Sequence, residues 1–264
     1  PYMRSPVKPK KFLGQHFLKD MDIARRIAET MIGYAGVPIL EIGPGTGVLT
    51  RFLLAAGHDL TVVEIDRESV AYLRAHFPEL DNRILEEDFL KLRLDKTFPG
   101  RFCVIGNYPY NISSQIFFKV LDYKDLIPCC SGMIQKEVAE RMASGPGNKN
   151  YGILSVLMQA WYDIEYLFTV PEHVFEPPPK VKSAVIRMTR NKVTDLGCSE
   201  QLFKQIVKTS FNQRRKTLRN SLKPILGKEC PLYESPIFDK RPEQLSVDQF
   251  ISLTKEIEVV LPVQ

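Results

Sequence analysis

Residues 39–47 read Ile-Leu-Glu-Ile-Gly-Pro-Gly-Thr-Gly, a short apolar run that ends in three closely spaced glycines. Such a run is typical of a buried strand, and the glycines let the chain turn tightly and approach a ligand closely. Further strand signals follow at 60–65, 83–88, 102–107 and 132–135. Helix-like segments separate the early ones, at 48–56, 68–77 and 113–121. This alternation predicts an α/β fold with a parallel sheet covered by helices on both faces.

The later part of the chain has a different pattern. Residues 164–170 and 183–189 predict two more strands, separated only by the proline-rich stretch 171–179. We therefore expect a mostly parallel, seven-stranded sheet with an antiparallel hairpin at one edge. After about residue 192 the pattern is helical, with helices predicted at 199–211, at 214–226 and from a capping box at Ser246 to about residue 258. Two domains follow, 1–192 with a basic N-terminal arm and 193–264 all helical.

Composition excludes several classes of protein. The chain has 264 residues, of which 44% are apolar and 25% charged, as in ordinary globular proteins. It has no apolar run near the ~18 residues that a membrane helix needs, and no apolar segment behind the basic N-terminus that would make a secretory signal. The five cysteines lack metal-ligand spacing, so we expect a reducing compartment, no disulfide framework and no metal.

The net charge of +5 hides two basic blocks that contain no acid. Residues 1–19 carry five basic groups and residues 201–228 carry eight, so the rest of the chain sums to 5 − 13 = −8. Blocks of this kind are typical of a protein that binds a polyanion. A solvated helix face would produce the same pattern, and charge alone does not separate the two readings.

Ligands of an open parallel sheet bind beyond the carboxyl ends of its strands. The first strand ends in the glycine turn with Gly43 and Gly45, which alone could be no more than a turn. Glu64 ends the second strand, 21 residues after Gly43, where an acid accepts hydrogen bonds from ribose hydroxyls. Asp88 ends the third strand and could accept from an adenine amino group. These positions fit either a nicotinamide cofactor or S-adenosylmethionine.

The fourth strand ends in Gly106-Asn-Tyr-Pro-Tyr-Asn111. The Asn107 side-chain oxygen and the Tyr108 carbonyl are two acceptors that can hold the hydrogens of an exocyclic amine, and Pro109 stiffens the backbone that carries them. Tyr110 offers a flat face for an extruded base. The alternative reading is a proline turn beside a core tyrosine. A nicotinamide dehydrogenase gives Asn107 and Tyr110 no task, and Val48 breaks the usual dinucleotide glycine spacing.

Six blocks of the sequence together resemble the ribosomal RNA adenine dimethyltransferases, most closely their bacterial small-subunit members. The blocks are 14–18, 41–47, 63–66, 107–113, 177–184 and 211–221. The resemblance, from about residue 10 to residue 226, implies a Rossmann-like, S-adenosylmethionine-dependent methyltransferase domain and a small helical domain that binds RNA.

The resemblance also implies roles for particular residues. Those implied to bind the cofactor are His16, Leu18, Gly43, Gly45, Glu64, Asp88, Phe89 and Asn107. Those implied to be catalytic are Asn107, Tyr110 and Phe175, with Phe175 facing Tyr110 across the target base. Those implied to bind RNA are Arg214, Arg215, Lys216, Arg219 and Lys223. The family usually has Asn where His16 stands and Leu where Tyr108 stands; we expect little functional change from Tyr108, because only its carbonyl is needed.

The activity implied is dimethylation of N6 on two adjacent adenosines in the 3′-terminal hairpin of 16S ribosomal RNA, late in assembly of the 30S subunit. The expected protein is a cytoplasmic monomer that acts on a pre-30S particle, without a metal or a membrane. Two alternatives remain open: a macrolide-resistance methyltransferase that acts on large-subunit RNA, and a ribosome-assembly factor that mainly binds.

Overall fold

The computed structural model describes residues 5–262 and divides the chain into two compact units. The first comprises Pro1–Ala139 and Ile164–Arg190, and the second comprises Glu140–Asp163 and Asn191–Gln264. The second unit thus takes in Glu140–Asp163, which the sequence analysis had placed in the first domain. The reason is local packing: Gln159 donates to the carbonyls of Met142 and Ser144, and the Tyr151 ring packs on Phe211.

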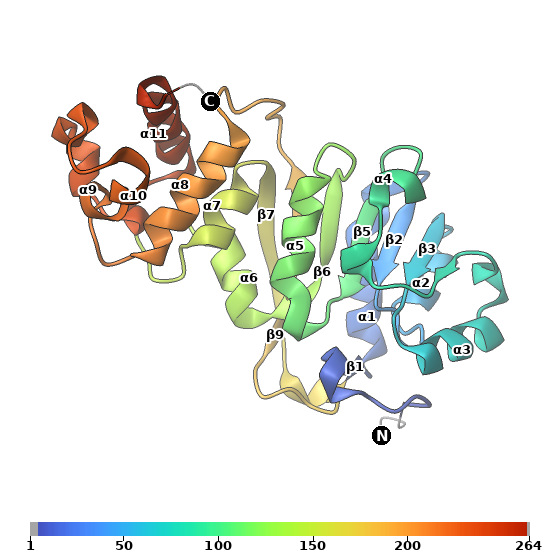
Figure 1. The fold of residues 1–264 in the computed structure, drawn as a ribbon. Helices are drawn as coiled ribbons and strands as arrows, with labels where there is room; N and C mark the ends of the chain where they lie inside the picture. The colour runs from blue at the N-terminus through green and yellow to red at the C-terminus, as the bar shows by residue number, and fades with distance from the viewer. Residues whose placement is uncertain (1–4, 263–264) are drawn as a thin grey trace. The chain divides into compact units, whose positions relative to one another are not determined.

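A seven-stranded sheet with the order β4-β3-β2-β5-β6-β9-β7 forms the centre of the fold (Figure 1). The strands are β2 (Ile39–Ile42), β3 (Leu60–Val63), β4 (Ile84–Leu85), β5 (Cys103–Asn107), β6 (Cys129–Gln135), β7 (Tyr162–Val170) and β9 (Ser183–Arg190). The first five pair in parallel, whereas β9 pairs antiparallel with β6 and β7 lies beside it at the edge. The expected sheet is therefore confirmed, and its strand order reverses between β2 and β5, where an α/β sheet binds its ligand.

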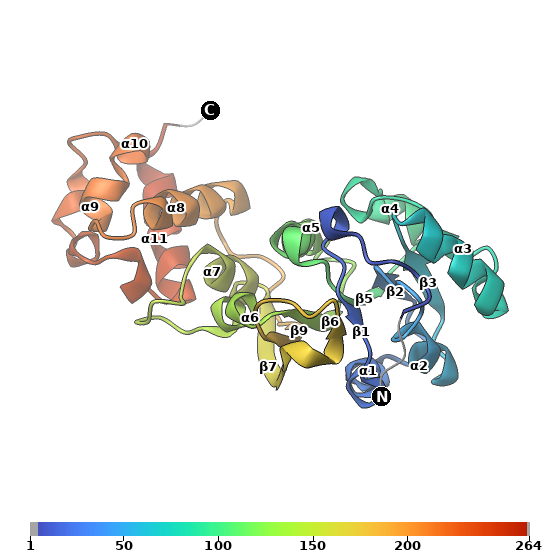
Figure 2. The ribbon, with the colours of Figure 1, turned by 90° about the horizontal axis from the view of Figure 1, so that it is seen from below.

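The helices of the first unit cover both faces of the sheet. Figure 2 shows α1 and α2 on one face and α5 on the other. Their bounds are α1 (Met21–Ala28), α2 (Thr50–Ala55), α3 (Arg67–His76), α4 (Leu94–Thr97) and α5 (Ser113–Asp122), and α6 (Lys136–Ala143) follows β6. The sequence analysis did not predict α1, although Asp20 caps it by accepting from the backbone N–H groups of Asp22 and Ile23.

The N-terminal segment is tied to the rest of the first unit by a second, two-stranded sheet. Strand β1 (Phe17–Leu18) pairs antiparallel with β8 (Phe175–Glu176), so that Leu18 lies opposite Phe175. Next to it, the Lys19 N–H donates to the Val174 carbonyl at 2.8 Å. This pairing holds residues 11–18 in place beside the carboxyl ends of the central strands.

The second unit is helical. Its helices are α7 (Ile153–Gln159), α8 (Glu200–Asn212), α9 (Leu218–Ser221), α10 (Lys223–Leu226) and α11 (Val247–Val260). Aromatic rings form its core, with Phe203 and Phe250 fully buried and Phe211 5.8 Å from Phe250 between ring centroids. The predicted capping box of the last helix is present, since the Gln249 N–H donates to Ser246 Oγ and Gln249 Oε1 accepts from the Ser246 N–H.

The expectation of one helix over 214–226 is wrong. Helix α8 ends at Asn212, the chain turns through Gln213 with ψ +53°, and only the four-residue helices α9 and α10 follow. Pro224 explains the second break, because proline has no N–H to donate within a continuing helix. Consequently Arg215 and Arg219 do not share one helix face.

Candidate active site

A cleft opens at the carboxyl ends of β2, β3 and β5. It encloses about 930 Å³ of space, counted together with the solvent at its open mouth. Its lining includes most of the residues expected to bind the cofactor and the target: His16, Gly43, Glu64, Asp88, Phe89, Asn107 and Tyr110. The structure therefore brings together side chains from five segments up to 94 residues apart, as the parallel-sheet rule predicts.

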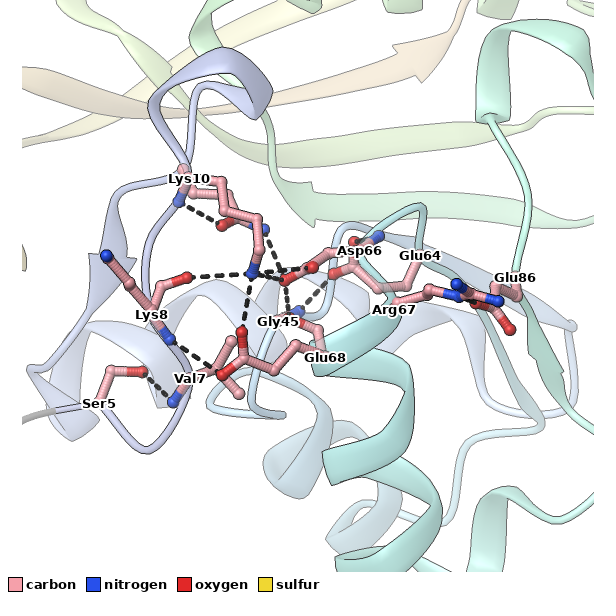
Figure 3. Close-up of polar contacts among 12 residues, drawn as sticks. Ser5, Val7, Lys8, Lys10, Gly45, Glu64, Asp66, Arg67, Glu68 and Glu86 are labelled. Atoms are coloured by element: carbon pink, nitrogen blue, oxygen red, sulfur yellow. Dashed lines mark hydrogen bonds and ion pairs between the residues drawn. The ribbon is translucent and has the colours of Figure 1, made fainter.

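The glycine turn and Glu64 form one wall of the cleft. Gly43 and Gly45 have φ values of +64° and +57°, a conformation that disfavours residues with a Cβ. A Cβ on Gly45 would also lie 3.1 Å from the Phe17 ring. Glu64 joins this turn to the next one, because its Oε1 accepts from the Gly45 N–H at 2.9 Å and its Oε2 from the Asp66 N–H at 3.0 Å (Figure 3).

Glu64 is 5% exposed, and burial raises the pKa of its carboxyl. Each carboxylate oxygen has one backbone partner and keeps acceptor capacity for another donor. The group is thus placed to accept hydrogen bonds from a hydroxyl pair in the cleft. Gly45 acts through this contact, since it does not itself line the cleft.

Asp88 and Phe89 form the opposite wall. The Asp88 side chain accepts from the Leu90 N–H at 3.0 Å and so caps the short turn Phe89–Lys91. Lys119 on α5 holds the other end of this turn: its ammonium donates to the carbonyls of Phe89 and Leu92 and lies 4.9 Å from the centroid of the Phe89 ring. The wall is therefore fixed before any ligand arrives.

Asn107 is the last residue of β5, and its side-chain amide is held by a residue 91 positions away. Its Nδ2 donates to the His16 carbonyl at 3.1 Å. A carbonyl can only accept, so this bond determines which way the amide faces. Within residues 5–262 the Asn107 Oδ1 accepts no hydrogen bond, so it remains an acceptor at the cleft.

Tyr108 follows Asn107 and points away from the cleft into the core. It is 1% exposed, and its hydroxyl donates to the Ser131 carbonyl at 2.6 Å. Glycines in the two neighbouring strands make room for its ring: a Cβ on Gly132 would lie 2.7 Å from a ring carbon and one on Gly106 3.2 Å. The Tyr108 N–H donates to the Met133 carbonyl at 3.0 Å. This bond and the bond from the hydroxyl to Ser131 hold the residue whose carbonyl is the second expected acceptor.

Tyr110 and His16 lie together in the cleft. Their rings are stacked with centroids 5.1 Å apart and an interplanar angle of 29°. Each is fixed from the segment 177–183: the Tyr110 hydroxyl contacts Ser183 Oγ, and His16 Nδ1 lies 2.8 Å from the Pro177 carbonyl. Sequence reasoning had placed His16 only along the cofactor and did not find this stacking.

Phe175 is not where the sequence analysis placed it. Its side chain is fully buried in the core among residues such as Leu18, Val174 and Val185, and it does not line the cleft. It therefore does not face Tyr110 across the space for a base. Leu18, paired with it in the small sheet, is likewise buried and outside the cleft lining.

The five basic residues of the second unit differ in what they contact. Arg214 donates to the carbonyls of Tyr151 at 2.6 Å and Asn148 at 3.3 Å. Arg219 forms an ion pair with Asp239 at 2.6 Å. Arg215, Lys216 and Lys223 are exposed. The surface charge open to a polyanion is thus smaller than the sequence suggests, and Arg214 has a structural task.

Residues 5–262 contain neither a cluster of metal-binding side chains nor a helix suited to span a membrane. No three His, Cys, Asp or Glu side chains come together in a way that could bind a metal. None of the helices there combines the length and the apolar character that crossing a bilayer requires.

Comparison with known proteins places the chain in a family. The model of the ribosomal RNA adenine dimethylase family matches residues 7–258. The chain is 75% identical to the ribosomal RNA small subunit methyltransferase A of Parabacteroides distasonis, over 94% of this chain and 93% of that protein. It is 63% identical to the protein of the same name from Porphyromonas gingivalis, over 94% and 97%.

Solved structures agree. A dimethyladenosine transferase from Plasmodium falciparum superposes with a TM-score of 0.75 at 26% identity, covering 91% of this chain and 97% of that one. The 23S rRNA methyltransferase ErmE follows with a TM-score of 0.67 at 25% identity, covering 90% and 99%. The expected methyltransferase fold and class of enzyme are confirmed: the chain belongs to the ribosomal RNA adenine dimethylase family.

Proposed function

We propose that this protein transfers methyl groups from S-adenosylmethionine to N6 of two adjacent adenosines in the 3′-terminal hairpin of 16S ribosomal RNA, late in assembly of the 30S subunit. The observation that carries the proposal is the Asn107 amide, locked by the His16 carbonyl with its oxygen left as an acceptor at the cleft. Relatives named for the small subunit are 63% and 75% identical to this chain, whereas the large-subunit methyltransferase is 25% identical. This difference supports the small-subunit substrate.

The residues that line the cleft suit S-adenosylmethionine in their chemistry. Gly43 would approach it through the backbone, Glu64 would accept from its ribose hydroxyls, and Asp88 with Phe89 would hold its adenine. His16 would lie near its methionine end, with Leu18 supporting the backbone there and Gly45 holding Glu64. When bound, S-adenosylmethionine supplies an electrophilic methyl group on a positively charged sulfur.

The task of the chain's own residues is to present the target amine. An exocyclic amine is a poor nucleophile, because its lone pair is delocalised into the purine ring. Asn107 Oδ1 and the Tyr108 carbonyl can accept its two hydrogens and favour a pyramidal nitrogen whose lone pair points at the methyl group. The Tyr110 ring would support the base from one face. Positioning of this kind, with neutral acceptors fixed where positive charge develops on the nitrogen, supplies the catalysis, so neither a metal nor a strong general base is needed.

The second methylation makes a further demand on the same residues. After the first transfer the methylated nitrogen loses one proton to solvent and retains a single hydrogen, so one of the two acceptors must release its contact. The Tyr108 carbonyl is fixed by the buried ring and by the bond from the Tyr108 N–H to Met133. Asn107 carries its acceptor on a side chain that a single hydrogen bond to His16 orients and that can rotate when this bond breaks, so we assign the adjustment to Asn107.

The second unit would hold RNA through its exposed cations, Arg215, Lys216 and Lys223, which would bind phosphates. Arg219 would reach a phosphate only by leaving Asp239, and Arg214 would act by holding the loop at Asn148 and Tyr151. We further propose that the protein acts as a monomer, in the cytoplasm, where ribosomal subunits assemble.

The test is mass analysis of adenosines after incubation of the protein with S-adenosylmethionine and RNA. Unmethylated small subunits, large subunits and free ribosomal RNA are compared side by side. We expect N6,N6-dimethyladenosine at adjacent positions of the small-subunit RNA. Product in the large subunit would instead identify a macrolide-resistance-type enzyme. A protein that promotes subunit assembly without forming any methylated adenosine would be a binding factor.

A further inference from the structure

Phe12 is an aromatic side chain that the proposed chemistry leaves without a task. It is 77% exposed, and it is the one aromatic residue among the exposed large hydrophobic side chains of residues 5–262. It also lines the mouth of the cleft, together with Tyr110 and Asn111. Burying an aromatic ring of this size is favourable, so an exposed ring at the edge of an active site indicates a contact surface.

The turn that carries Phe12 is held firmly, which argues against a loose surface loop. Phe12 is the middle residue of the short helix Lys11–Leu13, and the Asn111 side chain donates to its carbonyl at 3.4 Å. Gly14 ends the turn with φ +64°, where a Cβ would lie 2.6 Å from Asn111 Oδ1. The turn is therefore packed directly against the residue that follows Tyr110.

An ion-pair cluster fixes the start of the same turn (Figure 3). The Lys10 ammonium lies 2.9 Å from Asp66 Oδ1 and 3.0 Å from Glu68 Oε2, and the Lys10 N–H donates to Gln15 Oε1 at 2.8 Å. Gln15 Nε2 in turn donates to Asp66 at 3.2 Å. The Phe12 ring is thus presented from a rigid base, which lowers the entropy lost when it binds a partner.

Basic residues near the ring in sequence and near Tyr110 in the fold indicate what the partner is. Lys11 adjoins Phe12 in the sequence, and Lys180 and Lys182 closely precede Ser183, whose hydroxyl contacts that of Tyr110; all three lysines are exposed. An aromatic face among lysines fits a nucleotide, whose base stacks while its phosphate meets the cations. It fits an apolar protein surface less well, because lysines resist burial.

We propose that the Phe12 ring stacks on the unpaired base of the nucleotide directly 5′ or 3′ of the target adenosine. This contact would position the RNA strand over the cleft. The inference rests on the proposed function and deepens it, by naming a second base-binding ring beside Tyr110. Because the target site has two adjacent adenosines, Phe12 would hold one of them while the other lies at Asn107. Phe12 is a positioning residue for RNA and has no part in binding the methyl donor.

The test uses small subunits reconstituted around 16S RNA whose 3′ end is joined from a synthetic fragment. The fragment carries either the natural sequence or an abasic residue on the 5′ or the 3′ side of one target adenosine. The full-length wild-type protein is compared with Phe12→Ala, with Phe12→Trp, which keeps a stacking ring, and with Ile32→Ala. Ile32 is the matched control, because it is also an exposed apolar residue of the first unit, at 71%.

For Phe12→Ala we expect KM for the particle to rise about tenfold, the size of one lost base–aromatic stack, with kcat and the Kd of S-adenosylmethionine unchanged. For the wild-type protein, one of the two abasic substrates should raise KM by a similar factor. For Phe12→Ala, the same abasic substrate should have the KM of the natural substrate. Phe12→Trp and Ile32→Ala should behave as wild type.

Three results would overturn the inference. The first is a KM for the particle that is the same for Phe12→Ala as for Ile32→Ala. The second is an increase in KM from the abasic residue that is as large in Phe12→Ala as in wild type. The third is an increase in KM for Phe12→Ala on whole particles while neither abasic residue changes the KM of wild type. The last of these would indicate a ribosomal protein as the partner. A wild-type protein that methylates no adenosine would instead sink the proposed function, so the two failures are distinguishable.

Discussion

The Asn107 side chain and the His16 main chain meet at 3.1 Å, across 91 residues of sequence. One is the last residue of β5 and the other immediately precedes β1. The N-terminal segment thus sets the orientation of the amide on which the proposed chemistry depends.

Replacement of Asn107 should separate chemistry from cofactor binding. We expect Asn107→Ala to lower kcat by about 10²–10³, the cost of removing one preorganised polar group from an active site, with little change in the Kd of S-adenosylmethionine. Asn107→Asp keeps an acceptor but cannot donate to His16, so it should also be impaired. Single-turnover methylation and calorimetric titration measure the two effects, and full activity of Asn107→Ala would refute the assignment.

Tyr110 should act through its ring. Its hydroxyl contacts Ser183 and one face of its ring stacks on His16, so a base would bind at the opposite face. We expect Tyr110→Ala to raise KM for RNA about tenfold or more through the lost stacking, and Tyr110→Phe to have a small effect. Titrations with RNA and with S-adenosylmethionine should show a change for RNA alone; an equal loss for both ligands would mean that the ring only supports the fold.

The basic residues of the second unit should fall into two groups. Arg215→Gln with Lys216→Gln should reduce the slope of log Kd against log salt concentration by about 1.5, since each phosphate contact contributes about 0.7–0.9. Lys255→Gln, an exposed charge on α11, is the control and should leave the slope unchanged. A slope that does not move in the double variant would show that this surface does not touch RNA.

Arg214 should instead affect stability. Its guanidinium donates to the Tyr151 and Asn148 carbonyls, and a charged hydrogen bond of this kind contributes roughly 1–3 kcal/mol. We expect Arg214→Gln to lower the free energy of unfolding of the second unit by an amount in that range, measured by urea denaturation. An unfolding midpoint equal to that of wild type would contradict the structural role.

Glu41 should make stability depend on pH. It is 1% exposed, and burial raises the pKa of its carboxyl to about 8, although a hydrogen bond from Thr50 Oγ1 at 2.6 Å opposes the shift. The raised pKa means that the folded state favours the neutral acid. The stabilisation is therefore complete below the ordinary value of 4.5 and is lost as pH rises through about 8.

Glu41→Gln removes this titration and retains the acceptor for Thr50. Urea midpoints at several pH values between 5 and 9 should fall with rising pH for wild type and much less for the variant, with Glu79→Gln, an exposed acid, as control. Parallel curves for wild type and Glu41→Gln would rule out the assigned titration.

The sequence predicted those elements and site residues whose positions depend on local sequence patterns. Apolar runs and the glycine turn located the strands, and the rule that parallel strands end at one edge placed Glu64, Asp88 and Asn107 around one cleft. Helix α1 could also have been found, because Asp20 precedes apolar residues at helical spacing, namely Ile23, Ala24, Ile27 and Ala28.

What the sequence could not predict depends on contacts between distant segments. Nothing local shows that the His16 carbonyl meets Asn107, or that Gly106 and Gly132 leave room for the Tyr108 ring. Phe175 was misplaced because a strand pairing with Leu18, not its own neighbours, decides its burial. The helix over 214–226 was wrong because the chain leaves the helical conformation at Gln213 and because Pro224 interrupts the backbone hydrogen bonds.

The N-terminal segment that carries Phe12, Gln15 and His16 contributes to the cofactor cleft and, in our proposals, to the RNA surface as well. Two ligands that contact the same wall have linked affinities. Thermodynamic reciprocity then requires each ligand to change the binding constant of the other by the same factor. In our proposals, a change that separates Lys10 from Asp66 would therefore weaken the binding of both the methyl donor and the ribosomal RNA.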